Sequence, residues 1–191
     1  MSALTDQKPL REAEDVVSRD SFIGAMRTVA NSVHVVTTDG PAGRHGATVS
    51  AFCSVSADPP TVLVCLNADS RIARLVRANG QLAVNRLASD QAALASRFAG
   101  GDDAKLRLVQ ACEAAHCDRF AGVEVDPASP QPALTGALTL ICRVVQQHRA
   151  GSHDVVIAEV GAVLGDSTQP LVYLDGGYRE LSAPASENAR G

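Results

Sequence analysis

The residues between Ala47 and Ala57 alternate between apolar and small hydroxyl side chains, a pattern that could do binding chemistry. The odd positions are all apolar, and the even positions carry hydroxyls except at Phe52. Because successive side chains of a β-strand point to opposite faces, the pattern predicts a strand with one apolar face and one hydroxyl face. A polar, planar or phosphorylated ligand can approach the backbone closely over such a face. The alternative is a half-exposed strand whose hydroxyls contact only water.

A second feature that could do chemistry is the segment that begins at Ser70. Asp69 or Ser70 can cap a helix that runs to Asn79. The N-terminus of such a helix exposes unpaired N–H groups and a partial positive charge, and Arg71 lies beside them, so the pattern favours a phosphate site. The alternative is an ordinary capped surface helix whose Arg74 and Arg77 are solvated.

The five cysteines of the chain are an odd number without paired spacing, which indicates free thiols rather than a disulfide framework. A helix would place Cys112 and His116 on one face, with Cys117 adjacent. Zinc takes about four ligands and the sequence offers no second cluster, so packing or surface roles are favoured and no metal site is expected. The thiols that we expect to be buried in apolar strands are Cys53, Cys65 and Cys142.

Composition limits the classes of partner. The formal net charge of -4 and the lack of a basic run argue against nucleic acid as a ligand. The longest strongly apolar stretch, residues 62–66, is far shorter than the ~20 residues of a membrane-spanning helix. The first residues lack the apolar segment of a secretion signal, so a cytoplasmic protein is expected.

The elements that must position these residues are mainly strands. We expect flexible tails over residues 1–18 and 182–191 and one folded domain over 19–181. Strands joined by tight turns rather than by helical crossovers favour an antiparallel split or closed β-barrel with short peripheral helices. Residues 102–135 carry no clear pattern. The predicted strands are 33–38, 45–57, 61–66, 82–87, 137–148, 154–164 and 171–174, and the predicted helices begin near residues 20, 70 and 90.

The order of several segments resembles the flavin reductase-like family, the small NAD(P)H:flavin oxidoreductases that supply reduced flavin to two-component monooxygenases. The resemblance covers about residues 21–181 and implies a mainly β, FMN-binding split barrel. The segments that carry it are Phe22 to Thr38, Gly46 to Ser56, Pro59-Pro60, Phe98-Ala99-Gly100, Gly151-Ser152-His153, Pro170 to Tyr173 and Gly177-Tyr178-Arg179.

The resemblance implies which residues bind the flavin. The ring and ribityl chain would contact Thr48, Val49, Ser50, Ala51, Phe52 and Ser54. The ring or phosphate would contact Cys65, Leu66, Asn67, Ser70 and Arg71, with Asn85 and Arg86 reaching the same ligand. Phe98 is a cofactor contact on this interpretation and a core residue otherwise.

His153 is the residue that the resemblance places at the nicotinamide. The family often has Gly-Asp-His where this chain has Gly-Ser-His, so the acidic neighbour is replaced by Ser152. Without the resemblance, a histidine at a turn is a surface residue. Tyr178 and Arg179 are further candidates for the same pocket, with packing of the last strand as their alternative role. The other histidines receive no role: they are His34, His45, His116 and His148.

The function implied is reduction of FMN or FAD by NADH or NADPH, in a homodimer that feeds a partner monooxygenase. The cofactor carries the hydride chemistry, so the protein must position nicotinamide against flavin. Two alternatives remain open at this point. The first is an FMN-binding electron carrier or sensor of the same fold that does not turn over NADH. The second is a barrel without flavin whose hydroxyl face contacts only water.

Overall fold

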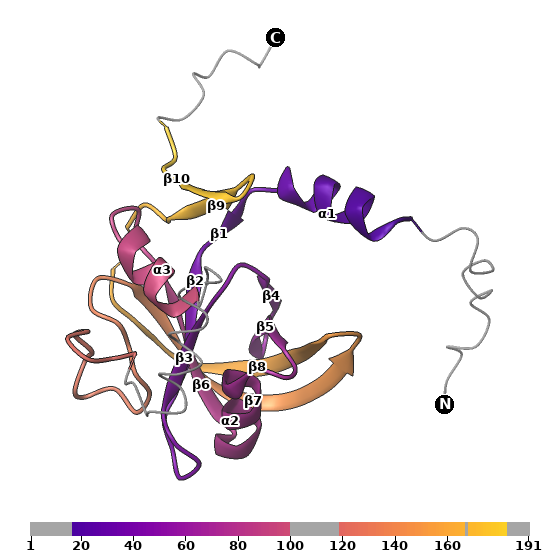
Figure 1. The fold of residues 1–191 in the computed structure, drawn as a ribbon. Helices are drawn as coiled ribbons and strands as arrows, with labels where there is room; N and C mark the ends of the chain where they lie inside the picture. The colour runs from indigo at the N-terminus through magenta and orange to yellow at the C-terminus, as the bar shows by residue number, and fades with distance from the viewer. Residues whose placement is uncertain (1–16, 100–118, 167, 183–191) are drawn as a thin grey trace.

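The computed structural model describes residues 17–99, 119–166 and 168–182, and it is built on one curved antiparallel sheet (Figure 1). Its seven strands lie in the order β3-β2-β6-β7-β8-β5-β4, so the two edge strands are neighbours in the chain. This arrangement confirms the expected mainly β architecture. The strands are β2 (His34–Thr38), β3 (His45–Val49), β4 (Phe52–Ala57), β5 (Pro60–Asn67), β6 (Gln81–Arg86), β7 (Leu138–Ala150) and β8 (His153–Leu164).

In the described part of the chain, a small second sheet and three short helices surround the barrel. The second sheet has the order β1-β9-β10, in which Tyr173 pairs with both Asn31 and Tyr178. None of the helices in the described part of the chain is long and apolar enough to cross a bilayer. The remaining elements are β1 (Asn31–Ser32), β9 (Val172–Leu174), β10 (Gly177–Arg179), α1 (Arg19–Arg27), α2 (Arg71–Asn79) and α3 (Ala92–Ala99).

The expected continuous strand over residues 45–57 is wrong, because the chain turns a corner at Ser50 and Ala51. β3 pairs with β2, whereas β4 pairs with β5 on the other side of the barrel. The backbone oxygen of Ala51 accepts a hydrogen bond of 3.0 Å from Cys65 N at this corner. Phe52, the residue that interrupts the alternation, packs its ring against that of His34 at a centroid distance of 4.4 Å.

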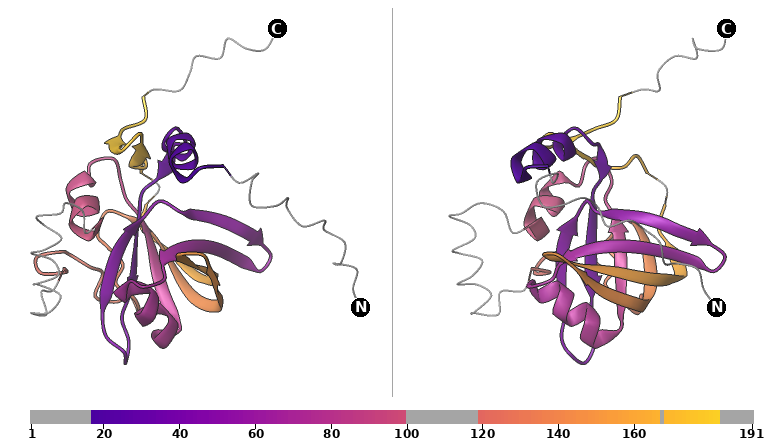
Figure 2. Two further views of the ribbon diagram at one scale, coloured as in Figure 1. Left: turned by 45° about the vertical axis from the view of Figure 1, so that its right-hand side comes forward. Right: turned by 90° about the vertical axis from the view of Figure 1, so that its right-hand side faces the viewer.

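The apolar positions of β4 do not enter the core either. Val55 is 53% exposed, and Cys53 and Ala57 are exposed as well. The β4–β5 hairpin projects from the barrel (Figure 2), and although β5 buries Val62 and Val64 in the core, most of β4 is left uncovered within one chain. The expectation of buried thiols therefore holds for Cys142, while Cys65 is half-buried and Cys53 is exposed.

Two apolar clusters hold the domain together. α2 buries Ile72, Ala73 and Val76 against the inner face of the barrel, as its apolar spacing predicts. On the other side, α3 buries Phe98 against Phe120, with ring centroids 5.2 Å apart. These two helices bracket β3, and their positions determine where a cavity can form.

Several predictions concern residues outside the described part of the chain. They are most of the two tails, residues 1–16 and 183–191, and the Cys112, His116 and Cys117 cluster. Among the described residues, no group of three or more His, Cys, Asp or Glu side chains is arranged to hold a metal ion.

Candidate functional site

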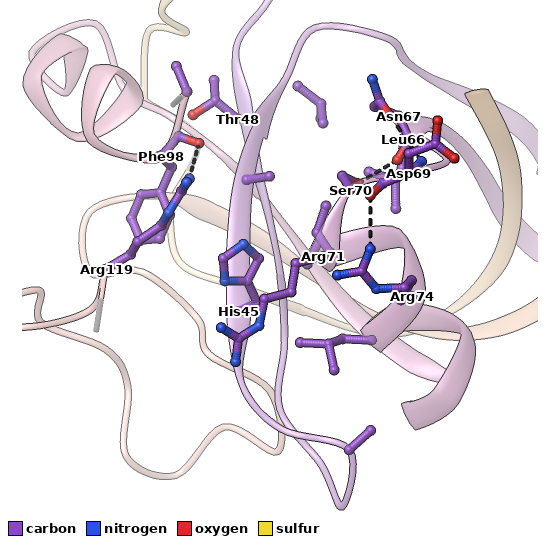
Figure 3. A pocket seen from close by; sticks show the side chains of 16 residues that line it. His45, Thr48, Leu66, Asn67, Asp69, Ser70, Arg71, Arg74, Phe98 and Arg119 are labelled. Carbon is purple, nitrogen blue, oxygen red and sulfur yellow. Dashed lines mark hydrogen bonds between the residues drawn. The ribbon is translucent and has the colours of Figure 1, made fainter. Parts of the chain in front are cut away.

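A cavity of about 960 Å³ lies between β3, the end of β5, the first turns of α2 and the end of α3 (Figure 3). Elements far apart in the sequence meet here because β3 and β5 approach each other at the split of the barrel. The sequence-predicted ligand residues that line the cavity are Thr48, Val49, Leu66, Asn67, Ser70, Arg71 and Phe98.

β3 forms one wall, and its backbone approaches α3 closely. A Cβ on Gly46 would lie 2.7 Å from Phe98 Cε1, so only glycine fits. The hydroxyl of Thr48 donates to Ala95 O at 2.7 Å, which ties β3 to α3 and leaves its oxygen lone pairs as acceptors. The apolar positions Ala47 and Val49 line the cavity too, so the wall is not built of hydroxyls alone.

The N-terminus of α2 opens into the same cavity, as the sequence predicts. Ser70 has extended backbone angles and caps the helix: its Oγ accepts from Ala73 N at 3.3 Å and donates to Asn67 O at 2.5 Å. The N–H groups of the first turn have no partners within the helix. Their partial positive charge and the Arg71 guanidinium face the cavity together, an arrangement suited to a phosphate group.

Further charges around the cavity were given no ligand role from the sequence. Arg74 and Arg119 line it, and each donates to a backbone oxygen, that of Asp69 at 2.9 Å and that of Phe98 at 3.0 Å. His45 also lines it, and it shares a face of β3 with Ala47. The two-residue period that places Ala47 on that face extends to position 45, so the sequence held a signal for His45.

A smaller cavity of about 180 Å³ lies at the other end of β3. Thr48, Val49 and Ser50 line it together with Tyr173 and Tyr178, whose rings are 5.7 Å apart. Tyr178, a candidate for the pocket of His153, lines this smaller cavity beside the hydroxyl segment. Arg179 is exposed, and its Nη1 donates to Tyr178 O at 2.9 Å rather than lining either cavity.

Asn85, which we expected to contact the ligand, lies in the core and lines neither cavity. The residue is fully buried, and its Nδ2 donates to Val35 O at 2.9 Å and to Thr37 Oγ1 at 3.1 Å. Its Oδ1 accepts from Leu134 N and from Thr139 Oγ1, both at 2.8 Å. Both the Nδ2 and the Oδ1 of the Asn85 side chain therefore form their hydrogen bonds inside the core.

Other predicted residues lie outside both cavities as well. Arg86 donates to Thr168 O at 2.9 Å, and Ala51 and Ser54 are exposed along the projecting hairpin. Phe52 packs on His34, as described above. Cys65 is half-buried, and burial raises the pKa of its thiol. These residues form the surroundings of the cavities rather than their lining.

His153 stands beside the large cavity and does not line it. It is the first residue of β8 and pairs with Asn67, which does line the cavity. The ring is exposed, and its Nδ1 lies 2.9 Å from Ser152 Oγ. The next residue, Asp154, is buried and accepts from Arg77 Nη2 at 2.8 Å, which fixes the start of β8 against α2.

Comparison with known proteins finds the same order of segments elsewhere. A family model described as "Flavin reductase like domain" matches residues 26–182. The chain is 41% identical to FMN reductase (NADH) RutF 2 of Methylorubrum extorquens (strain PA1), over 91% of this chain and 96% of that protein. Two solved structures superpose well. The flavin reductase PheA2 gives a TM-score of 0.74 at 28% identity, over 87% of this chain and 100% of the other. The flavin reductase of styrene monooxygenase from Pseudomonas putida S12 gives a TM-score of 0.70 at 26% identity, over 86% of this chain and 99% of the other.

Proposed function

This chain belongs to the flavin reductase-like family, and from that membership we infer that it catalyses the NADH-dependent reduction of a flavin, with FMN as the flavin. The relative in Methylorubrum extorquens that supports this choice is named for FMN and NADH. A hydride passes from the reduced nicotinamide to the flavin ring, so the protein has to bind and orient two ring systems rather than to supply an acid or a base.

The observation that carries the proposal is the cavity where β3 meets the N-terminus of α2. A flavin phosphate fits the first-turn N–H groups of α2, the Ser70 cap and the Arg71 guanidinium. The flat, partly apolar wall made by Ala47, Thr48 and Val49 suits the flavin itself. Asn67 and Leu66 close the far side of the same cavity.

His153 is proposed for the nicotinamide side. Its pairing with Asn67 places an exposed imidazole at the rim of the flavin cavity, where a second planar substrate can enter from solvent. Tyr178, beside Thr48 and Ser50 in the smaller cavity, is proposed as a further contact to one of the two rings. Aromatic side chains stack well on planar rings.

We propose that the reduced flavin is released to a partner monooxygenase. The support is the structural likeness to the flavin reductase of styrene monooxygenase. The alternative, an electron carrier or sensor with the same fold, differs in one property: it would hold a stoichiometric flavin and would not turn over NADH. A cytoplasmic location stays a prediction from the sequence.

A homodimer is proposed from two surfaces that one chain leaves uncovered. α1 has no buried residue, and its apolar side chains Phe22 and Met26 are 55% and 47% exposed. The β4–β5 hairpin projects with Val55 exposed (Figure 2). A nine-residue helix is marginal in water without packing, so a second copy that covers this apolar face would stabilise it.

The experiment that tests the function is anaerobic mixing of the purified protein with excess free FMN and NADH, followed through the absorbance of oxidised flavin. The proposal expects catalytic bleaching of many equivalents of FMN. Bleaching of only one bound equivalent would favour the electron carrier, and no bleaching at all would contradict flavin reduction by this chain. FAD and NADPH in parallel assays establish which pair of substrates the enzyme prefers.

A further inference from the structure

His45 is a buried imidazole that faces the large cavity without a partner. It is the first residue of β3 and is only 9% exposed, and the exposed part lines the cavity. Within the described part of the chain, neither ring nitrogen has a hydrogen-bond partner. The ring nitrogens are not among the polar atoms enclosed by the protein, so they are open to the cavity and can form a hydrogen bond with a ligand group there.

Arg71 on α2, beside His45, also lacks a partner among the described residues. Arg71 is half-buried, and its guanidinium forms no ion pair or hydrogen bond with another described residue. Figure 3 shows the His45 ring between Arg71 on one side and Phe98 with Arg119 on the other. A half-buried guanidinium without a counter-ion beside an unpartnered imidazole is suited to an anion.

Among the described residues, the other charged groups near His45 do not supply that anion. Arg74 and Arg119 add positive charge to the cavity, and Arg44 on the preceding turn places its guanidinium over the Phe120 ring. The Asp69 carboxylate also lines the cavity, but it lies 3.4 Å from Arg149 Nη1 and is thus paired elsewhere. The described charged groups that act on His45 are therefore mainly arginines.

We propose that His45, together with Arg71, recognises the phosphate group of the bound flavin and takes up a proton from solvent when this phosphate binds. This role rests on the proposed function, because FMN is the phosphate carrier. The proton returns to solvent when the flavin leaves, so the step is balanced over one catalytic cycle. His45 is a specificity-determining residue on this view, separating phosphorylated flavin from riboflavin.

The physical reason for proton uptake is the change in charge around the ring. In the free protein, burial lowers the pKa of His45 from 6.5 to about 4, and Arg119, Arg71 and Arg74 act in the same direction. The imidazole is therefore neutral at physiological pH. A phosphate monoester carries about -1.5 to -2 charges at pH 7 and compensates the arginines, so it raises the pKa of His45 in the complex.

This linkage predicts the direction of a pH effect. Where the free imidazole is neutral and the bound one is charged, binding is favoured by low pH and weakens as the pH rises through the pKa of the complex. The second ionisation of the phosphate, near pH 6, acts in the opposite direction. In a His45→Gln variant the arginines and the phosphate of the ligand are unchanged, but residue 45 cannot gain a proton. The ratio of the FMN dissociation constants of the variant and the wild type therefore isolates the contribution of His45.

The test is calorimetric titration of FMN and riboflavin at pH 5.5 and pH 8 into the wild type, His45→Gln and the control His148→Gln, whose histidine is exposed on β7. If the bound phosphate restores the pKa of His45 to its ordinary value of 6.5, the His45→Gln substitution weakens FMN binding about tenfold at pH 5.5 and scarcely at pH 8. Riboflavin binding and the control variant show no such dependence. Titrations in buffers of different ionisation enthalpy show that at pH 5.5 the wild type takes up nearly one proton more per FMN than His45→Gln does, because the ionisation of the phosphate contributes equally to both.

The outcomes separate this role from the proposed function. If FMN binds and His45→Gln weakens FMN binding equally at both pH values, or if the wild type and His45→Gln take up the same number of protons with FMN, the role of His45 is overturned while flavin reduction stands. If His45→Gln instead raises the KM for NADH and leaves FMN binding intact, the phosphate belongs to the dinucleotide and the proposal is wrong. If the wild type binds no FMN, both the function and the role of His45 are wrong.

Discussion

Asn67 and His153 are register partners across the β5–β8 pair, so an exposed imidazole lies one strand away from a residue that lines the large cavity. We expect His153→Ala to raise the KM for NADH roughly tenfold, the effect of losing about 1.4 kcal/mol of binding, and to leave the affinity for FMN nearly unchanged. Steady-state kinetics with each substrate varied in turn measure both effects. His148→Ala is the matched control, and an unchanged dependence on NADH would remove His153 from the nicotinamide site.

Gly46 is a position where one methyl group would disturb the cavity. A Cβ there would lie 2.7 Å from Phe98 Cε1, and Phe98 is both a core residue and part of the lining. Gly46→Ala is expected to lower the free energy of unfolding by about 1–3 kcal/mol, as overpacking does, and to weaken FMN binding. Gly24→Ala in α1 is the control, since a Cβ there meets no atom within 4 Å. Equal effects of the two substitutions in urea unfolding and FMN titration would contradict this account.

Asn85 tests whether a predicted ligand residue belongs to the core. Asn85→Ala leaves Leu134 N and Thr139 Oγ1 without their acceptor, so the free energy of unfolding should fall by roughly 2–4 kcal/mol. The KM for FMN of the folded enzyme should stay within about twofold of the wild type, less than 0.5 kcal/mol. Chemical denaturation and kinetics check the two effects separately. A large rise in KM with unchanged stability would return Asn85 to the ligand site.

His34 makes the fold sensitive to acid. Burial lowers its pKa from 6.5 to about 4, with Arg86 acting in the same direction. The unfolded chain therefore binds a proton here at a higher pH than the folded protein does, and the stability that this histidine contributes is full above pH 6.5 and lost as the pH falls toward 4. Between pH 7.5 and pH 5 this loss amounts to about 2 kcal/mol.

His34→Gln should reduce the difference in unfolding free energy between those two pH values by that amount. Urea denaturation at each pH measures it, with His148→Gln as the exposed control. The same pH dependence in His34→Gln and the wild type would show that other groups cause the loss.

The uncovered apolar surfaces predict the behaviour of the protein in solution. Val55→Asp on β4 and Phe22→Asp on α1 place a charge on surfaces that we propose to lie between two copies of the chain, and both should shift the protein toward monomer. Sedimentation velocity over a range of concentrations measures this shift. Ala93→Asp, on the exposed side of α3, is the control. A wild type that is monomeric at all concentrations would contradict the homodimer.

Periodicity was sufficient to predict most of the barrel. The alternation of β7 and β8 and the turn at Gly151, whose φ is 59°, are local features, and a strand or a turn depends mainly on its own residues. The corner at Ser50 and Ala51 was missed because the alternation of side chains continues almost through it. Only the pairing of β3 with β2 and of β4 with β5 requires the chain to turn there.

The same distinction between local and long-range features applies to the residues of the candidate site. The Ser70 cap and the position of Arg71 were predictable because a helix N-terminus forms from a few consecutive residues. The burial of Asn85 and the charges that surround His45 were not predictable, because both depend on residues that lie far away in the chain. Asn85 bonds to Leu134 and Thr139, and His45 faces arginines of α2 and of the segment at Arg119.

The amino-acid sequence by itself therefore determined most of the strands, the capped helix and the family to which the chain belongs. The tertiary structure decided which of the polar side chains meet in a cavity and which are consumed in the core. The reason is physical: a hydrogen bond or a charge acts over a few ångströms of space, and only the folded barrel brings β3, β5 and α2 within that distance.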